Sequence, residues 1–349
     1  MAEKANMDFL KEFNKEISKI QGIGTSSLPP RYWYSTGNHV LNRIISGNFS
    51  NGIPQGRITD LAGSSGSGKS FVAANLVKSA QHQGAYCLVI DSENALDDDF
   101  MSKIGVNVDD GYKYVEVTTI AQVIDVVSKF IKGYRNAVGE DVNAPQVFIL
   151  IDSLDMLMTE TELATYEKGD QKGDFGQKSK QLKQMLRSFV HDIKKLNITM
   201  VVTSQVYKNQ DVLNGEGLWI VSDAVKYACS QIILLSKLKL KDDSGKSGKF
   251  AGIRMKCEGY KTRFTKPFQT ITVEVPYETG MDPYSGLLDT AVGLGIVEKR
   301  GSRYAMANSD TTWYEKDWDP YIKEILDKAE AMSGGFLKVN TIDDVEMVD

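Results

Sequence analysis

Residues 63–70 combine glycines, a lysine and a hydroxyl at a spacing that binds phosphate groups. They read Gly63, Ser64, Ser65, Gly66, Ser67, Gly68, Lys69 and Ser70, and they fit the pattern G-x-x-x-x-G-K-[ST]. Glycines let the backbone curl around an anion, and the N-terminus of the following helix points its N–H groups at it. Lys69 adds a mobile cation. The segment, with the adjoining Phe71, therefore predicts a triphosphate cradle rather than a plain Gly/Ser-rich turn.

Two acidic residues follow apolar runs and supply the chemistry that a bound triphosphate needs. Asp152 ends the run 146–151, and Glu93 closely follows the run 85–90. One carboxylate can hold Mg²⁺ through its water shell while the hydroxyl of Ser70 ligates the ion directly. The other can polarise a water in line with the γ-phosphate. An acidic residue after a strand is common, so Asp152 becomes a metal candidate only together with Lys69 and Ser70.

The surrounding chain alternates apolar strand-like runs with helical stretches. Such two-sided apolar strands indicate an α/β, doubly wound, mostly parallel sheet with helices on both faces and ligands at the carboxyl ends of the strands. Three further runs alternate as antiparallel strands that extend the sheet, with a hairpin tip at 242–245. The strand-like runs are 57–62, 85–90, 114–117, 146–151 and 198–203, the helices are 71–81, 121–134 and 177–196, and the antiparallel runs are 231–240, 250–256 and 268–275.

The two ends of the chain differ from this core. Residues 8–20 place Phe9, Leu10 and Phe13 at helical spacing, and glycines and two prolines end the pattern before residue 31. A short helix cannot bury its apolar stripe alone, so it packs on its own core or on a neighbouring copy. The predicted domains are an N-terminal oligomerisation helix and linker (1–30), the core (31–280), a small C-terminal lobe (281–340) and an acidic tail (341–349).

Two long polar stretches leave the sheet edge that carries the cradle. They span 158–176 and 207–221, and the second has an apolar tip that includes Trp219. Long loops at such an edge are commonly functional, so Trp219 suits base stacking or, alternatively, a plain packing contact. The basic turn 299–304 also has two interpretations, a solvated turn or a contact with duplex DNA.

Composition excludes several classes. The 349 residues carry a net charge of −5, which argues against wholesale wrapping of nucleic acid but allows local basic grooves. No stretch is apolar enough to span a membrane and no signal peptide is visible, so we expect a cytoplasmic protein. The cysteines and histidines stand alone and predict neither a disulfide nor a metal cage. They are Cys87, Cys229, Cys257, His39, His82 and His191.

From about residue 35 to 304 the chain resembles the RecA recombinases, and most closely the phage UvsX-type proteins. The resemblance rests on 35–37 with 56–58, on 91–97, and on the stretch 282–289 that favours the phage subgroup. It implies a RecA-like P-loop ATPase core in which Glu93 activates water. It also implies that Asp97 and Phe100 hold the adenine ring, with Phe100 standing where the cellular proteins have tyrosine.

The same resemblance implies a link between nucleotide and loop. Gln205 matches the γ-phosphate sensor at the root of the second DNA-binding loop, where an amide can bond the phosphate and move the loop with it. Lys261 and Arg263 match the paired cations that reach the ATP of the neighbouring protomer, as an arginine finger does. Tyr227 matches an interface aromatic.

Lys180 and Arg187, seven residues apart on one helix face, match phosphate contacts beneath the first loop; the alternative is that they are solvated helix charges. The second loop lacks the paired glycines of the cellular proteins, so the resemblance implies no particular contact inside either loop.

The expected activity is single-stranded-DNA-dependent hydrolysis of ATP with Mg²⁺, by a recombinase that forms helical filaments on single-stranded DNA. It would exchange strands with duplex DNA in recombination, repair and replication. Expected partners are a single-strand-binding protein and a loader, in the host cytoplasm if the gene belongs to a phage. Two alternatives remain open, a RecA-like hexameric helicase and a non-hydrolysing mediator that ATP switches.

Overall fold

The structure is a computed structural model that describes residues 2–20, 29–139, 141, 143–170, 176–193, 196–208, 219–241 and 250–333. The chain divides into two units, Met1–Arg31 and Tyr32–Asp349. In the first unit, α1 (Ala2–Ser18) carries the exposed side chains of Phe9, Leu10 and Phe13. The helix therefore begins six residues before the predicted start at residue 8 and ends two before the predicted end at residue 20.

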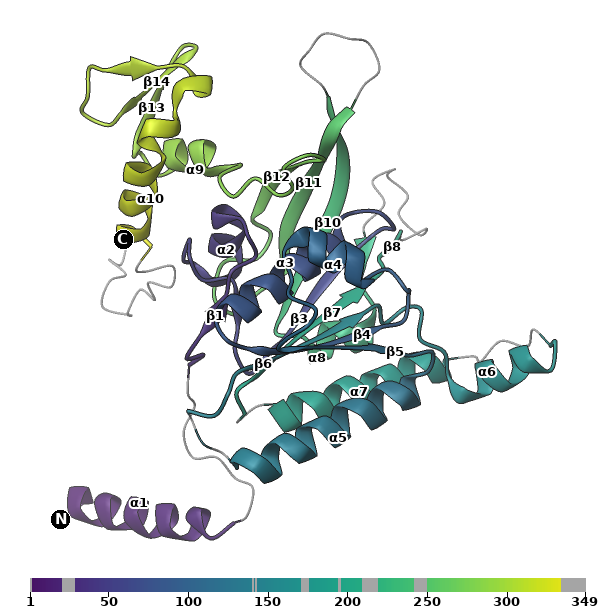
Figure 1. The fold of residues 1–349 in the computed structure, drawn as a ribbon. Coiled ribbons are helices and arrows are strands. Elements are labelled where there is room, and N and C mark those ends of the chain that lie inside the picture. Colours follow the sequence, from purple (N-terminus) through teal and green to yellow (C-terminus); the bar gives the residue numbers. More distant parts are fainter. Residues whose placement is uncertain are drawn as a thin grey trace. The chain divides into compact units, whose positions relative to one another are not determined.

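The second unit is built on an eight-stranded sheet, in the order β12-β11-β10-β3-β7-β6-β4-β5 (Figure 1). The strands from β10 to β5 are parallel to their neighbours, whereas β11 and β12 run antiparallel and extend the sheet. The predicted α/β class and the antiparallel extension are confirmed. The strands are β3 (Ile58–Gly63), β4 (Tyr86–Asp91), β5 (Tyr112–Glu116), β6 (Val147–Asp152), β7 (Ile198–Ser204), β10 (Gln231–Lys241), β11 (Phe250–Lys261) and β12 (Thr270–Pro276).

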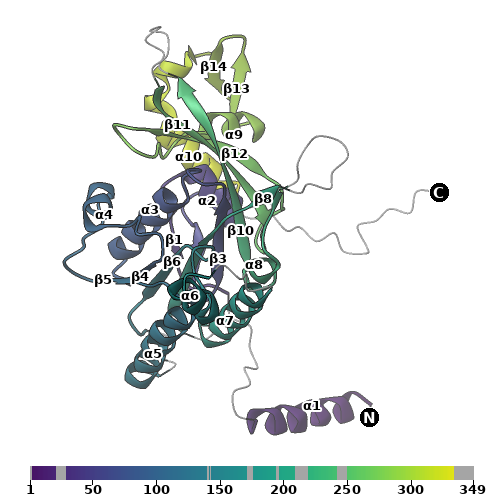
Figure 2. The ribbon, with the colours of Figure 1, turned by 90° about the vertical axis from the view of Figure 1, so that its right-hand side faces the viewer.

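Helices cover both faces of this sheet, because its central strands are apolar on both sides. Neighbouring residues of β6 show this, since Ile149 packs into one core and Leu150 into the other. One core includes α5, α7 and α8, and the opposite core includes α2, α3 and α4 (Figures 1 and 2). The helices are α2 (His39–Ser46), α3 (Lys69–His82), α4 (Asp98–Ile104), α5 (Ile120–Val138), α7 (Gln177–Ile193) and α8 (Asp223–Ala228).

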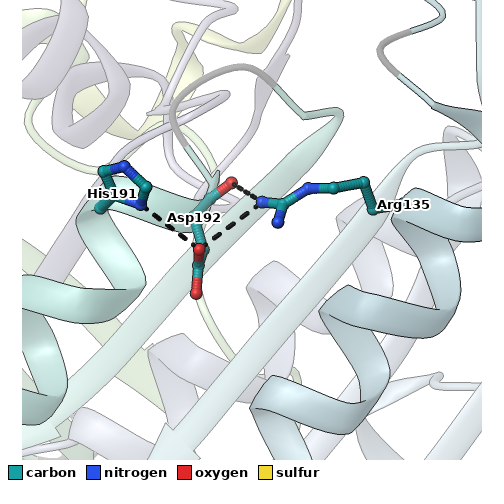
Figure 3. Close-up of polar contacts among 3 residues, drawn as sticks. All are labelled: Arg135, His191 and Asp192. Atoms are coloured by element: carbon teal, nitrogen blue, oxygen red, sulfur yellow. Dashed lines mark hydrogen bonds and ion pairs between the residues drawn. The ribbon is translucent and has the colours of Figure 1, made fainter. Parts of the chain in front are cut away.

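A polar contact joins α5 to the end of α7 (Figure 3). Arg135 donates to the main-chain oxygen of Asp192 at 3.4 Å, and its guanidinium lies 3.5 Å from the carboxylate of the same residue. The ring of His191 approaches that carboxylate at 3.5 Å. Partly exposed pairs of this kind contribute little free energy, so the apolar core fixes the two helices.

The first predicted loop is not structureless. Residues 158–176 contain α6 (Glu160–Glu167), which begins with a capping box between Thr159 and Glu162. The Thr-x-x-Glu spacing was a visible sequence signal for this helix. In the second loop, β8 (Tyr207–Lys208) pairs antiparallel with β9 (Trp219–Ile220). Residues 171–175 and 209–218, and the side chain of Trp219, lie outside the described residues.

The C-terminal part forms a small lobe with its own apolar core. Val40 of α2 and Phe49 belong to that core, and Glu330 accepts hydrogen bonds from Asn48 and Ser50. The predicted hairpin tip 242–245 and the acidic tail 341–349 lie outside the described residues. The remaining elements are β1 (Trp33–Tyr34), β2 (Ile53–Pro54), α9 (Leu287–Gly293), β13 (Val297–Arg300), β14 (Arg303–Met306), β15 (Thr312–Trp313), η1 (Glu315–Asp317), η2 (Asp319–Tyr321) and α10 (Ile322–Ala331).

Candidate active site

Four adjacent parallel strands end at the same edge of the sheet, because β3, β7, β6 and β4 are neighbours that run in one direction. The phosphate cradle follows β3, Gln205 follows β7, Asp152 ends β6 and Glu93 follows β4. Topology alone thus gathers residues that lie more than a hundred positions apart in the sequence.

The cradle is tightly packed against β10. A Cβ on Gly63 would lie 2.4 Å from the main-chain oxygen of Leu235, so no other residue fits there without a shift. Gly68 has a φ of 99°, in the region that favours glycine, and directly precedes α3. Lys69 is a buried residue, and its ammonium donates to the main-chain oxygens of Gly63 at 3.1 Å and Ser64 at 3.2 Å. Lys69 is therefore held inside the loop that it serves.

The cradle opens into a cavity of about 280 Å³. This cavity brings together predicted residues from the cradle, from the segment after β4 and from the end of β7. Ala95 is an additional lining residue that sequence reasoning missed. The lining residues are Ser65, Gly66, Gly68, Lys69, Ser70, Phe71, Glu93, Ala95, Phe100 and Gln205.

Asp152 is a buried carboxylate with one unused oxygen. The hydroxyl of Thr203 donates to Oδ1, whereas Oδ2 has no hydrogen-bond partner within the described part of the chain. Burial raises the pKa of Asp152, and the hydroxyls of Thr203 and Ser70 oppose that rise. An unpartnered buried oxygen near Ser70 fits a hard cation such as Mg²⁺. The described residues contain no group of three or more His, Cys, Asp and Glu side chains able to hold a metal, so phosphate oxygens and water would have to supply further ligands.

Glu93 is positioned by a neighbour that the sequence did not single out. The hydroxyl of Ser153 donates to Glu93 Oε1 at 2.5 Å, and Ser92 donates to the main-chain oxygen of Ser153 at 2.7 Å. The carboxylate of Asp91 accepts four main-chain N–H groups, those of residues 93–96, and so fixes the turn that carries Glu93. Asp91 directly follows the apolar run 85–90, and an aspartate in that place was the available sequence signal for such a turn.

The two predicted adenine contacts have different positions. Phe100 lines the cavity, whereas Asp97 does not. Asp97 is the N-cap of α4 and accepts a hydrogen bond from the main-chain N–H of Phe100 at 2.8 Å. Asp97 therefore holds the helix turn from which Phe100 projects.

Gln205 lines the cavity, and its backbone is tied to a residue that sequence reasoning missed. Asp155 Oδ2 accepts the main-chain N–H of Gln205 at 2.6 Å, and Oδ1 accepts the hydroxyl of Tyr207 at 2.9 Å. Burial and the neighbouring Asp155 carboxylate raise the pKa of Tyr207 to about 12. No sequence motif marks Asp155, because its partners follow the neighbouring strand β7, 50 and 52 positions further along the chain.

A second buried acid, Asp60 of β3, lies behind the cradle. Ser204 donates to its Oδ2 at 2.9 Å, and Oδ1 has no partner among the described residues. Burial raises the pKa of Asp60 to about 8, and the negative charge of Asp155 adds to the rise. The hydrogen bond from Ser204 and the charge of Lys69 act in the opposite direction.

A second hollow lies at the opposite, amino end of β3, with a volume of about 440 Å³. We call it the basic groove, lined by Arg57, Lys183, Arg187, Arg263 and Tyr227 among others; none of its described lining side chains is acidic. Tyr227 is 72% exposed, and the ammonium of Lys183 lies 4.8 Å from the centre of its ring. The groove thus brings together Tyr227 and Arg263, which the resemblance assigned to the neighbouring protomer, and Arg187, which it assigned to DNA phosphates.

Lys261 and Lys180 lie beside this groove rather than in its lining. Lys261 donates to the main-chain oxygens of Lys226 and, at 2.8 Å, of Cys229, so it caps the C-terminal end of α8. Burial and the charge of Arg263 lower the pKa of Lys261. Lys180 and Arg187 line a shallow hollow along α7.

The fold and the site define an α/β protein with a P-loop at the carboxyl edge of a RecA-like sheet. The family model described as "RecA N-terminal domain" matches residues 5–282. The chain therefore belongs to the RecA family.

Curated relatives agree with this assignment. The chain is 28% identical over 335 residues to "Protein RecA" of Treponema denticola, covering 94% of this chain and 75% of that protein. It is 28% identical over 275 residues to "Protein RecA" of Rickettsia massiliae (78% and 75%) and 29% identical over 259 residues to that of Aquifex pyrophilus (73% and 68%). None of the helices in the described ranges has the length and apolar character that crossing a bilayer requires.

Proposed function

We propose that this protein is a single-stranded-DNA-dependent ATPase that polymerises on single-stranded DNA and exchanges strands with a homologous duplex. Membership of the RecA family supports the class of activity. The observation that carries the proposal is the convergence of Lys69, Ser70, Glu93 and Gln205 on one cavity at the carboxyl edge of the sheet.

In this proposal the cradle and α3 bind the β- and γ-phosphates of ATP, and Lys69 supplies the cation that pairs with them. Ser70 and Asp152 would hold Mg²⁺, which neutralises phosphate charge when bound. Glu93 orients the attacking water, and Ser153 restricts the carboxylate of Glu93 to a geometry that faces the cavity.

The site would be completed by an adjacent copy of the chain. Arg263 is exposed in the basic groove beside Tyr227, a place from which it can reach a phosphate on a second protomer. Lys261 would have to leave the carbonyl oxygens at the end of α8 to do the same. A cation supplied across an interface makes hydrolysis depend on assembly.

DNA binding is proposed for loops 158–176 and 207–221, with Lys180 and Arg187 on phosphates and Trp219 stacking on bases. Lys180 and Arg187 share a face of α7, which supports a common polyanionic partner. Binding through phosphates should weaken steeply with salt concentration.

The finer assignment is to the phage UvsX-type subgroup, supported by the stretch 282–289. It implies work in recombination, repair and replication in the host cytoplasm, with a single-strand-binding protein and a loader. The domain division at residues 30, 280 and 340 belongs to the same proposal.

Phosphate release with and without single-stranded DNA tests the proposal. The wild-type rate should rise on adding DNA. Glu93→Gln should lower the rate by about 10²-fold or more while ATP still binds. An unchanged wild-type rate would contradict a DNA-dependent ATPase. Electron microscopy with an ATP analogue separates open helical filaments from the closed rings of a helicase.

A further inference from the structure

Asp155 connects three parts of the molecule that the proposed function uses separately. Its carboxylate holds the main-chain N–H of Gln205, which lines the nucleotide cavity, and the hydroxyl of Tyr207, which begins the second loop. Its main-chain oxygen accepts the ammonium of Lys178 at 2.5 Å, from the first turn of α7. Asp155 thus lies between the cavity, the second loop and the helix that follows the first loop.

The location of Asp155 is fixed by the sheet rather than by its own side chain. It comes three residues after Asp152, and the main-chain N–H of Leu154 bonds to the oxygen of Thr203 at 3.0 Å. The segment that leaves β6 therefore stays paired with the last residues of β7. This pairing aims the Asp155 carboxylate at the root of the second loop.

We propose that Asp155 is a positioning residue that couples the nucleotide state of the cavity to the DNA affinity of the second loop. The inference rests on the proposed function, because it presupposes that Gln205 senses the γ-phosphate. In this view Asp155 ties the Gln205 main chain to the Tyr207 hydroxyl, so a displacement of the Gln205 backbone is passed on to β8.

The chemistry of the two hydrogen bonds suits this role. Bonds to an ionised acceptor are roughly twice as strong as neutral ones. Loss of the carboxylate would leave the part-buried N–H of Gln205 without its partner. Tyr207 is 55% exposed, so its hydroxyl would turn to water and the strand would move independently of Gln205.

The test measures a coupling ratio, defined as the dissociation constant of a labelled oligothymidylate with ADP divided by that with ATPγS. Linkage requires that this ratio also describes how DNA changes nucleotide affinity. Asp155→Ala should lower the ratio by about tenfold, and Tyr207→Phe by about threefold, on the magnitudes of lost hydrogen bonds. In the double variant, Tyr207→Phe should add nothing to Asp155→Ala, because Tyr207 acts through Asp155.

Asp125→Asn, which alters an exposed i,i+4 ion pair with Lys129 on α5, is the matched control and should leave the ratio unchanged. Tyr207→Phe removes a single hydroxyl and keeps the test valid if Asp155→Ala fails to fold. A wild-type ratio above one that both variants retain would overturn the role of Asp155 alone. A wild-type ratio of one would instead overturn the proposed function and this inference together.

Discussion

The nucleotide cavity and the basic groove lie at opposite ends of β3 and are built in opposite ways. In the cavity, Lys69 donates to two main-chain oxygens and Glu93 accepts from Ser153. In the groove, Arg57, Lys183, Arg187 and Arg263 gather without an acidic side chain in the described lining. The polar groups of the cavity are held by partners within the same chain. The groove instead gathers side chains of the same, positive charge.

The difference indicates which region needs a second molecule. Burial lowers the pKa of Arg57, and the like charge of the neighbouring Arg263 lowers it further. An anion brought by another molecule would offset that repulsion. The contrast therefore supports the proposal that the cavity is preformed within one chain, whereas the groove is completed on assembly.

The largest expected effect is at the cavity. Lys69→Ala should reduce ATP hydrolysis by about 100-fold or more, because the cradle loses the cation that faces developing phosphate charge. Phosphate release is the measurement, and Lys323→Ala on the exposed surface of α10 is the control. A Lys69→Ala protein with wild-type turnover would remove the cavity from consideration as the active site.

Mixing two inactive proteins tests the groove. Lys69→Ala retains Arg263, and Arg263→Ala retains Lys69, so each can repair the other across an interface. An equal mixture should recover about one quarter of the wild-type rate, because a random head-to-tail array pairs both intact residues at that share of interfaces. No recovery, with both variants still assembling on DNA, would show that the two regions do not meet between protomers.

The next effect concerns how Asp60, the buried acid behind the cradle, changes the stability of the fold with pH. The pKa of the Asp60 carboxyl is about 3.9 in an unfolded chain, and burial raises it to about 8 in the folded protein. The protonated carboxyl of Asp60 therefore contributes fully to the free energy of unfolding below the unfolded-state pKa. This contribution is lost as pH rises through the folded-state pKa, by up to about 1.4 kcal/mol per pH unit. Asp60→Asn should abolish this slope.

Urea unfolding of Asp60→Asn and wild type between about pH 5 and about pH 8 checks the sign. The free energy of unfolding of the variant should increase relative to that of the wild type as pH rises. A difference in unfolding free energy that is constant across this range would mean that Asp60 is ionised in the fold throughout.

The smallest effect separates the two predicted interface cations. Lys261→Met should lower the free energy of unfolding by about 1 kcal/mol, since two carbonyl oxygens at the end of α8 lose their donor. Arg263→Met should change it by less than about 0.5 kcal/mol, as expected for an exposed side chain. Equal losses would mean that Lys261 is as free as Arg263 and does not cap α8.

Much of the fold followed from local pattern. Apolar runs such as 146–151 can only be buried on both faces, which requires helices above and below a parallel sheet. Once the sheet is parallel, Lys69, Asp152, Glu93 and Gln205 must share an edge. Hence the gathering of these four residues at one edge was predictable from the sequence.

By itself the sequence determined the strand–helix alternation, the cradle and the edge at which chemistry is placed, because these depend on short-range periodicity and one topological rule. Only the tertiary structure decided that Asp155 holds Gln205, that Ser153 holds Glu93 and that Lys261 caps α8. These contacts depend on the register of neighbouring strands and on side-chain directions across them, and no local pattern of residues encodes either.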